Sequence, residues 1–154
     1  MINALDSGED KIVILAANAL GNLKDVRAIP SLCATYRRYH GVYGGIDGKG
    51  ISMAAWDALK SITKNPKGDP GPALIHQLTN EDNYHSSYEI VVFAAGALGK
   101  SKDVRAVPSL IKTYKRCNGL CGPVDENHPS RAAWNALEKI AGASEAKKQT
   151  DQAR

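Results

Sequence analysis

Few residues in this sequence could form a metal site or a reactive thiol site. Cys117 and Cys121 are close together and His128 follows them, so the three side chains could ligate zinc. Structural zinc sites, however, combine more closely spaced cysteine pairs with a second pair elsewhere, and this chain has neither. The remaining cysteine is Cys33, and three cysteines do not indicate a disulfide framework. We therefore predict no metal and no cofactor, with free thiols favoured over a local disulfide in a reducing cytoplasm.

Two glycine-rich segments, residues 40–50 and 118–129, are the next candidates. Glycine-rich loops can hold phosphate groups through their backbone N–H groups. Here no Gly-Lys-Ser/Thr sequence occurs and no strand is expected before either segment, so nucleotide binding is disfavoured. Both segments are interpreted as extended connectors, which can also carry function.

Aromatic and cationic side chains gather where two helices are expected to end. One cluster occupies residues 36–40 and the other residues 114–116. Tyrosine and arginine are favoured at protein interfaces, because they combine contact area with rigid hydrogen-bonding geometry. Alternatively, the tyrosines cover the core and the cations face water, where the helix dipole also favours them. The predicted partner-binding residues are Tyr36, Arg37, Tyr39, His76, Tyr114, Lys115 and Arg116. No catalytic residue is predicted.

Most of the sequence is an internal repeat. Three segments recur 78 residues later almost unchanged: 16–21 at 94–99, 24–32 at 102–110, and 54–59 at 132–137. A half-period of 39 residues is marked by Ala-Leu pairs ending at Leu20, Leu59, Leu98 and Leu137. A unit of about forty residues is typical of helical-hairpin repeats.

The apolar pattern predicts two helices in each unit. In the first unit, Val13, Ala16 and Leu20 fall on one face of a first helix, and Ile29, Leu32 and Tyr36 on one face of a second. Pro30 lies so early that the second helix either begins near it or has an irregular first turn. The second unit has helices near 52–63 and 73–78, with 81–85 as a linker, and the fourth has one near 130–140.

The domain is therefore predicted to span residues 1–142, and the rest to form a polar tail. Its units are about 9–47, 48–86, 87–125 and 126–142, and the tail is 143–154. The tail contains no large apolar residue, so either a polar helix or disorder is expected.

Two recurring features have two interpretations each. Asp25 with Arg27, repeated as Asp103 with Arg105, suits a ladder of helix caps and ion pairs between repeats, and partner binding is the alternative. The tryptophans at positions 56 and 134 match one another and suit packing against a neighbouring hairpin, with ligand stacking as the alternative.

The string Ala-Ala-x-Ala-Leu-Gly, followed by Lys-Asp-Val-Arg-Ala-Ile/Val-Pro-Ser-Leu, resembles the HEAT-like repeat family named after the phycocyanobilin lyases. The resemblance covers roughly residues 10–142. It implies an all-α fold, a right-handed α-solenoid of about four hairpins with the last incomplete. Such repeats occur in lyase subunits, hydroxylases and adaptors, so the resemblance specifies the fold more narrowly than the function.

One catalytic branch of this repeat class can be compared residue by residue. Deoxyhypusine hydroxylases hold a di-iron centre with His-Glu dipeptides. The four histidines here, His40, His76, His85 and His128, are followed by glycine, glutamine, serine and proline. That activity is therefore not expected.

Charge and hydropathy narrow the function further. The net charge of +4 is spread evenly, with 9 basic and 7 acidic residues up to position 78. A dispersed excess disfavours nucleic acid, for which a concentrated basic patch is expected. The longest apolar stretch, residues 12–20, is too short to span a bilayer, and no basic signal-peptide region precedes it.

We expect a cytoplasmic, non-catalytic scaffold for a protein or peptide with an acidic surface. Alternatives are an accessory subunit of a bilin lyase-like enzyme and, more remotely, a nucleic-acid-binding protein.

Overall fold

The structure is a computed structural model that describes residues 1–40, 46–117 and 127–152. Helices make up nearly all of these three segments, and they contain no β-strand, only one isolated bridge between Asp25 and Lys67. The chain divides into two compact units, Met1–Ala73 and Leu74–Arg154. The all-α prediction is confirmed. No described helix is both long enough and apolar enough to cross a membrane.

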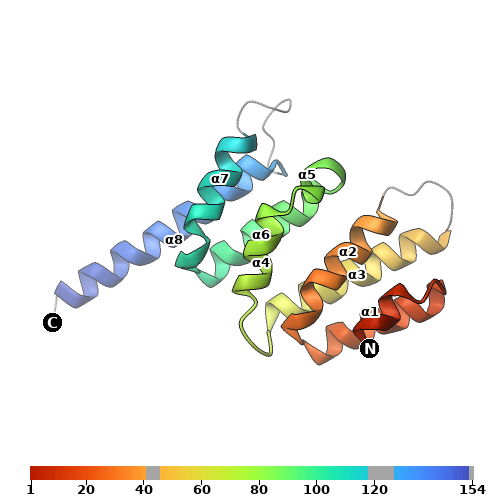
Figure 1. The fold of residues 1–154 in the computed structure, drawn as a ribbon. Coiled ribbons are helices and arrows are strands. Elements are labelled where there is room, and N and C mark those ends of the chain that lie inside the picture. The colour runs from red at the N-terminus through yellow and green to blue at the C-terminus, as the bar shows by residue number, and fades with distance from the viewer. Residues whose placement is uncertain (41–45, 118–126, 153–154) are drawn as a thin grey trace. The chain divides into compact units, whose positions relative to one another are not determined.

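The first unit is built around three helices (Figure 1). In chain order it contains η1 (Ile2–Asp6), α1 (Asp10–Leu23), η2 (Val26–Ala28), α2 (Ile29–Tyr39) and α3 (Ile46–Lys64). Helix α3 packs against both α1 and α2, and η1 packs against the same two helices. The enclosed core is aliphatic, and its fully buried members include Leu5, Val13, Ile29, Leu32, Ile51, Leu59 and Ile62.

The second unit repeats this plan. It contains most of α4 (Gly71–Thr79), then α5 (Asp82–Ser86), α6 (Tyr88–Ser101), η3 (Val104–Ala106), α7 (Val107–Cys117) and α8 (Pro129–Gln152). Helix α8 packs against α6 and α7, as α3 packs against α1 and α2. The short helix α5 packs against α6 at the place that η1 takes beside α1.

The turn that joins α1 to α2 and the turn that joins α6 to α7 have the same conformation. Lys24 and Lys102 both adopt left-handed backbone conformations, with φ of 57° and 55°. The next residue, Asp25 or Asp103, caps a single 3₁₀ turn, and the α-helix follows immediately. Pro30 lies in the first turn of α2, where its missing N–H would have had no helical partner anyway. The sequence had left open an irregular first turn or a helix that begins near Pro30. The structure has both, because the 3₁₀ turn η2 is followed by α2 from Ile29.

Each unit also contains one close helix crossing at glycine. A Cβ placed on Gly21 would lie 2.8 Å from the Cα of Ala58, and a Cβ placed on Gly99 would lie 2.8 Å from the Cα of Ala136. Because glycine has no Cβ, only glycine lets α1 approach α3, and α6 approach α8, so closely. The glycine of the recurring Ala-Leu-Gly sequence therefore lies at a close helix crossing in each unit.

Helix boundaries differ from the sequence prediction in two places, and in a third the sequence had left helix and disorder open. Helix α3 begins at Ile46, so part of the glycine-rich segment 40–50 is helical rather than a connector. The expected linker 81–85 is largely the short helix α5. The polar tail continues α8 as helix to Gln152. Asn65-Pro66 stops α3 because proline cannot continue a helix, whereas the equivalent residues 143–144 are alanine and serine, which can.

Candidate functional site

In the first unit, the end of α2 forms an aromatic cluster. The Tyr36 ring is buried and stacks on the exposed His40 ring at a centroid distance of 4.6 Å. It also contacts the Trp56 ring of α3 at 4.8 Å. Tyr36 therefore offers little surface to a partner and instead positions His40 and Trp56. The other two predicted residues here, Arg37 and Tyr39, are half-buried on α2.

The thiol of Cys33 lies in the core of the same unit. Burial raises its pKa to about 12, although the positive charge of nearby Arg37 acts in the opposite direction. A thiol needs its ionised form to act as a nucleophile or a metal ligand. Cys33 is consequently a packing residue.

In the second unit, a cluster of polar contacts connects α7 with α4 and α5. The Arg116 guanidinium lies over the Tyr84 ring of α5, 4.2 Å from its centroid. Its Nη1 atom is also 3.5 Å from the Glu81 carboxylate. The Tyr84 hydroxyl is 2.7 Å from the Leu78 carbonyl oxygen, to which it donates, and 3.0 Å from the Thr113 hydroxyl. Burial raises the Tyr84 pKa, so the phenol stays protonated and keeps this donor.

The equivalent position of the first unit contains a related contact. Arg38 corresponds to Arg116 and Asp6 to Tyr84 in the 78-residue register, and Arg38 forms an ion pair with Asp6 at 3.1 Å. Both units therefore contain the same kind of contact. Arg38 near the end of α2 is held by Asp6 of η1, and Arg116 near the end of α7 is held by Tyr84 of α5. Sequence analysis missed Tyr84, Glu81 and Asp6 because the repeat weakens outside the helices that align best. Extending the register to residues 3 and 6 would have aligned Asp6 with Tyr84 and Asn3 with Glu81.

The third helix adds a tryptophan beside each tyrosine. Trp134 contacts the Tyr114 ring at 5.5 Å and donates its indole N–H to Glu138 at 2.9 Å. Its side chain is nevertheless 45% exposed, whereas Trp56 is half-buried. Both tryptophans pack against the preceding helix, which agrees with the packing interpretation. Exposed Lys115 follows Tyr114 on α7.

His76 lies on α4, exposed to solvent. Its Nδ1 atom is 3.4 Å from the amide nitrogen of Gln77. Two residues further on is Leu78, whose carbonyl accepts the Tyr84 hydroxyl. In the second unit, the predicted partner-binding residues therefore lie on α4 and on α7. The Tyr84 hydroxyl contacts both helices, at the Leu78 carbonyl and the Thr113 hydroxyl.

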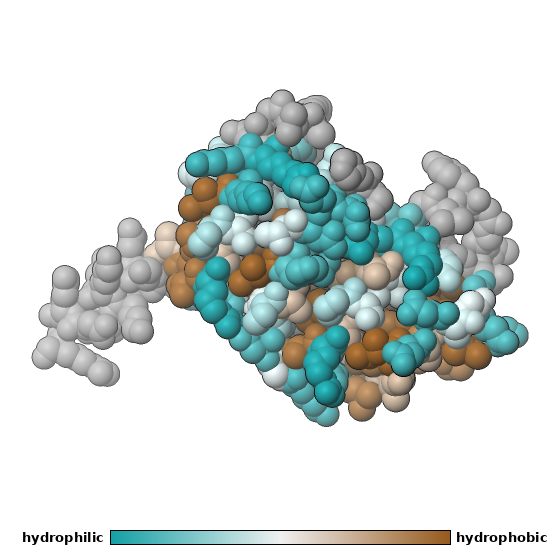
Figure 2. All heavy atoms as spheres, viewed as in Figure 1, coloured by the Kyte–Doolittle hydropathy of each residue, from teal (hydrophilic) through white to brown (hydrophobic). Residues whose placement is uncertain are grey.

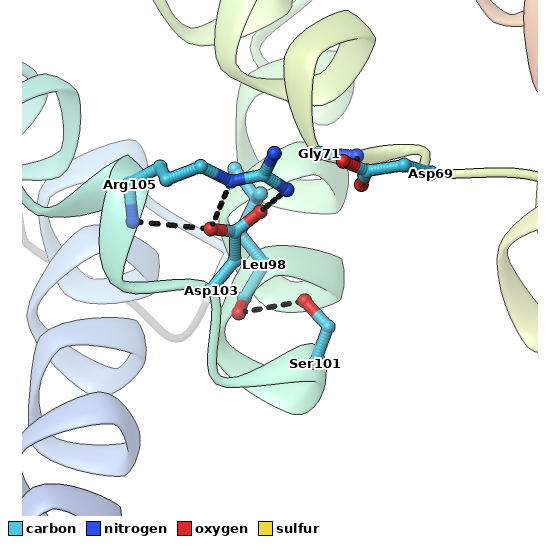
Figure 3. A network of polar contacts seen from close by, with 6 residues as sticks. All are labelled: Asp69, Gly71, Leu98, Ser101, Asp103 and Arg105. Atoms are coloured by element: carbon cyan, nitrogen blue, oxygen red, sulfur yellow. Dashed lines mark hydrogen bonds and ion pairs between the residues drawn. The ribbon is translucent and has the colours of Figure 1, made fainter.

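The repeated Asp-Arg pairs are local. Asp103 accepts from the backbone N–H of Arg105 at 3.0 Å and from its guanidinium at 2.9 and 2.7 Å (Figure 3). Asp25 and Arg27 make the same contacts, and they hold the pKa of Asp25 at about 2. These contacts lie within one turn, so they cap η2 and η3. The caps that the sequence suggested are therefore present, and ion pairs between repeats stay a prediction.

The metal-site candidate falls partly outside the described residues, because Cys121 lies in 118–126. Part of the glycine-rich segment 40–50 and most of the segment 118–129 also lie outside them, in 41–45 and 118–126. His128, a member of that candidate, is 2.7 Å from the Ser130 hydroxyl. Within the part of the chain that the structure describes, no three His, Cys, Asp or Glu side chains are grouped so that they could hold a metal ion.

Comparison with known families gives one match. Residues 14–36 match the family model described as PBS lyase HEAT-like repeat. They cover most of α1, the capped 3₁₀ turn and most of α2, and the same elements recur 78 residues later. No curated protein and no solved structure matches the chain. Residues 14–36 are therefore similar to a PBS lyase HEAT-like repeat, in a chain whose described residues are mostly helical and form two similar units.

Proposed function

We propose that this chain is a non-catalytic scaffold that binds an acidic segment of a protein or peptide through its second helices, α2 and α7. The HEAT-like repeat supports a helical scaffold. The observation that carries the proposal is the arginine held at the end of each second helix, Arg38 by Asp6 and Arg116 by Tyr84. Lys115, exposed beside Arg116, adds a second cation in the second unit.

Holding a cation in place matters for binding, because a long flexible side chain otherwise loses conformational entropy when a partner immobilises it. Arg116 has already lost much of that freedom through its contact with Tyr84. A guanidinium stacked on a ring keeps its N–H edge, which fits a carboxylate in a planar, bidentate way. Its ion pair with Glu81 is long at 3.5 Å, so a better-placed partner carboxylate can compete with it.

The wider arrangement expected from the sequence is a right-handed α-solenoid of about four hairpins with the second helices on its concave face. It stays a prediction. The proposal requires only that each unit present its own second helix, and so each unit should contribute separately.

Selection from a random peptide display library on the purified chain tests the proposal. We expect the enriched peptides to be acidic, and a synthetic copy with a fluorescent label gives the affinity by anisotropy. Combining Arg38→Glu with Arg116→Glu should weaken binding at least about tenfold, since like charges oppose the partner at both helices. The matched control combines Lys11→Glu with Lys139→Glu, which makes the same charge change on α1 and α8 and should leave the affinity within about twofold.

Four outcomes would count against the proposal. The enriched peptides could carry no excess of acidic residues, or the two double variants could bind equally well. Alternatively, the chain could bind phycocyanobilin, seen as a change in the absorption spectrum, which favours the lyase-accessory alternative. Binding of a labelled single-stranded oligonucleotide with a steep salt dependence would favour the nucleic-acid alternative.

A further inference from the structure

The turn before α7 repeats the turn before α2, but the two differ in what lies against them. Residues 24–28 and 102–106 share the sequence Lys-Asp-Val-Arg-Ala and the same capped 3₁₀ turn. In the first unit, Lys67 donates its backbone N–H to the Lys24 carbonyl oxygen at 2.8 Å, and Lys67 and Asp25 form a parallel bridge. The segment between α3 and α4 therefore pairs with this turn through its backbone.

A glycine in that segment lies against the valine of the turn. Gly68 has a φ of 115°, and a Cβ placed on it would lie 3.0 Å from Cγ2 of Val26. Any other residue at position 68 would be strained by this backbone conformation and crowded by Val26. Val26 is half-buried beside the glycine. The first unit therefore shows which kind of segment fits the turn, an extended one with a glycine directly after the N–H donor.

The same turn of the second unit lacks this covering segment. Residues 145–146 correspond to 67–68 in the 78-residue register, and they lie within α8 because that helix continues where α3 stops. In residues 46–117 and 127–142, no backbone N–H donates to the Lys102 carbonyl. The second unit therefore has the acceptor of the first unit without its donor.

Three apolar side chains follow Lys102 at a spacing of three and four residues, and we call them the open face: Val104, Val107 and Ile111. Val104 is 65% exposed and Ile111 40%, and Val107 is half-buried. The counterparts of Val107 and Ile111 in the first unit, Ile29 and Cys33, are both fully buried. Figure 2 shows apolar atoms at the surface in the part of the view where Figure 1 draws α7.

The uncovered turn already has the conformation of the covered one. The φ of Lys102 is 55° and that of Lys24 is 57°. Asp103 fixes the turn by accepting from the backbone N–H and the guanidinium of Arg105 (Figure 3). A segment that binds here would not have to reorganise the turn, and reorganisation is one of the costs that lower affinity.

We propose that the turn before α7 and the open face bind a short extended segment of another protein, as the turn before α2 binds residues 67–68 of its own chain. The segment has a glycine against Val104, and the residue before that glycine donates its backbone N–H to the Lys102 carbonyl. Proteins commonly recognise extended peptides through main-chain hydrogen bonds of this kind. The site lies at the start of α7, whereas the acidic segment proposed above binds at the end of α7, so the two proposals can fail separately.

A synthetic peptide with the sequence of residues 64–72 is the probe, because it contains the segment that covers the turn of the first unit. Titrated into the full chain labelled with ¹⁵N, it should shift the backbone amide signals of Asp103 and Val104. We expect a dissociation constant of about 0.1–1 mM, since the contact is small. The same peptide with a methyl group on the backbone nitrogen of Lys67 lacks the donor and should bind at least about fivefold more weakly. A peptide with Gly68→Val should also bind more weakly, because its side chain would crowd Val104.

A pair of protein variants tests the same site from the other side. Val104→Glu should weaken peptide binding at least about tenfold, because it places a charge in an apolar contact. Leu15→Glu is the matched control, since Leu15 is an apolar side chain of α1 with 68% exposure, and it should leave the affinity unchanged. Circular dichroism checks that both variants are folded.

Any of four results overturns the proposal. The peptide could cause no shift at Asp103 and Val104 up to about 5 mM, a concentration well above the expected dissociation constant. The methylated peptide could bind as well as the unmodified one, or the two protein variants could bind equally. Finally, the amide signals of Asp103 and Val104 could move with protein concentration when no peptide is present, which would show that a second copy of this chain supplies the segment.

Discussion

Replacing Gly99 by alanine should destabilise the second unit, although alanine is the better helix former. The added Cβ would lie 2.8 Å from the Cα and 3.0 Å from the Cβ of Ala136 on α8. Carbon atoms in contact prefer about 3.5–4.0 Å, so α6 and α8 must separate by roughly 1 Å at their closest point. The obstructing atom is backbone and cannot rotate away.

Two opposing free energies set the size of the effect. Forcing an extra methyl group into a packed contact costs about 2–3 kcal/mol when the neighbour cannot move aside. The gain in helix propensity from glycine to alanine is about 1 kcal/mol. We therefore expect the free energy of unfolding to fall by about 1–2 kcal/mol, the difference between these two values.

Gly96 provides a control in the same helix, three residues earlier. A Cβ at this position has no atom within 4 Å, so Gly96→Ala keeps only the propensity gain and should stabilise by about 0.5–1 kcal/mol. Urea unfolding followed by Trp134 fluorescence, in a Trp56→Phe background, reports on the second unit. The reasoning is refuted if Gly99→Ala and Gly96→Ala shift the unfolding midpoint in the same direction.

Two further predictions concern polar contacts. Tyr84→Phe should lower the free energy of unfolding by about 1–2 kcal/mol, because the Leu78 carbonyl loses its donor in a buried site. Combined with Thr113→Val, the loss should be less than additive in a urea-unfolding cycle, and full additivity would show that the hydroxyl contact is not formed. Asp25 has a pKa of about 2 in the folded chain, below its ordinary 3.8, so its stabilising contribution is present above about pH 4 and is lost as pH falls towards 2. Thermal midpoints measured across that range should fall less in Asp25→Asn than in the parent, and equal slopes would contradict the role of Arg27.

The candidate site was only partly predictable. The sequence identified Tyr36, Tyr114 and Arg116 from residue type and position at the ends of the second helices. It could not show that Tyr36 is buried under His40, nor that Arg116 lies on Tyr84, because both contacts depend on how side chains from different helices meet. Asp6 was missed because the 78-residue repeat weakens outside the helices that align best.

The sequence by itself determined the helical class, the 78-residue repeat and the caps, because these depend on local backbone preference and on apolar spacing along one helix. Gly21 and Gly99 show what the sequence could not determine. The recurring motif was visible in the sequence, but its role at a helix crossing became clear only from the positions of Ala58 and Ala136. Tertiary structure alone decided which apolar side chains are covered. Ile12 and Ile90 are the same residue at the same repeat position, yet one is exposed and the other buried, because burial depends on what packs against a helix and not on the helix itself.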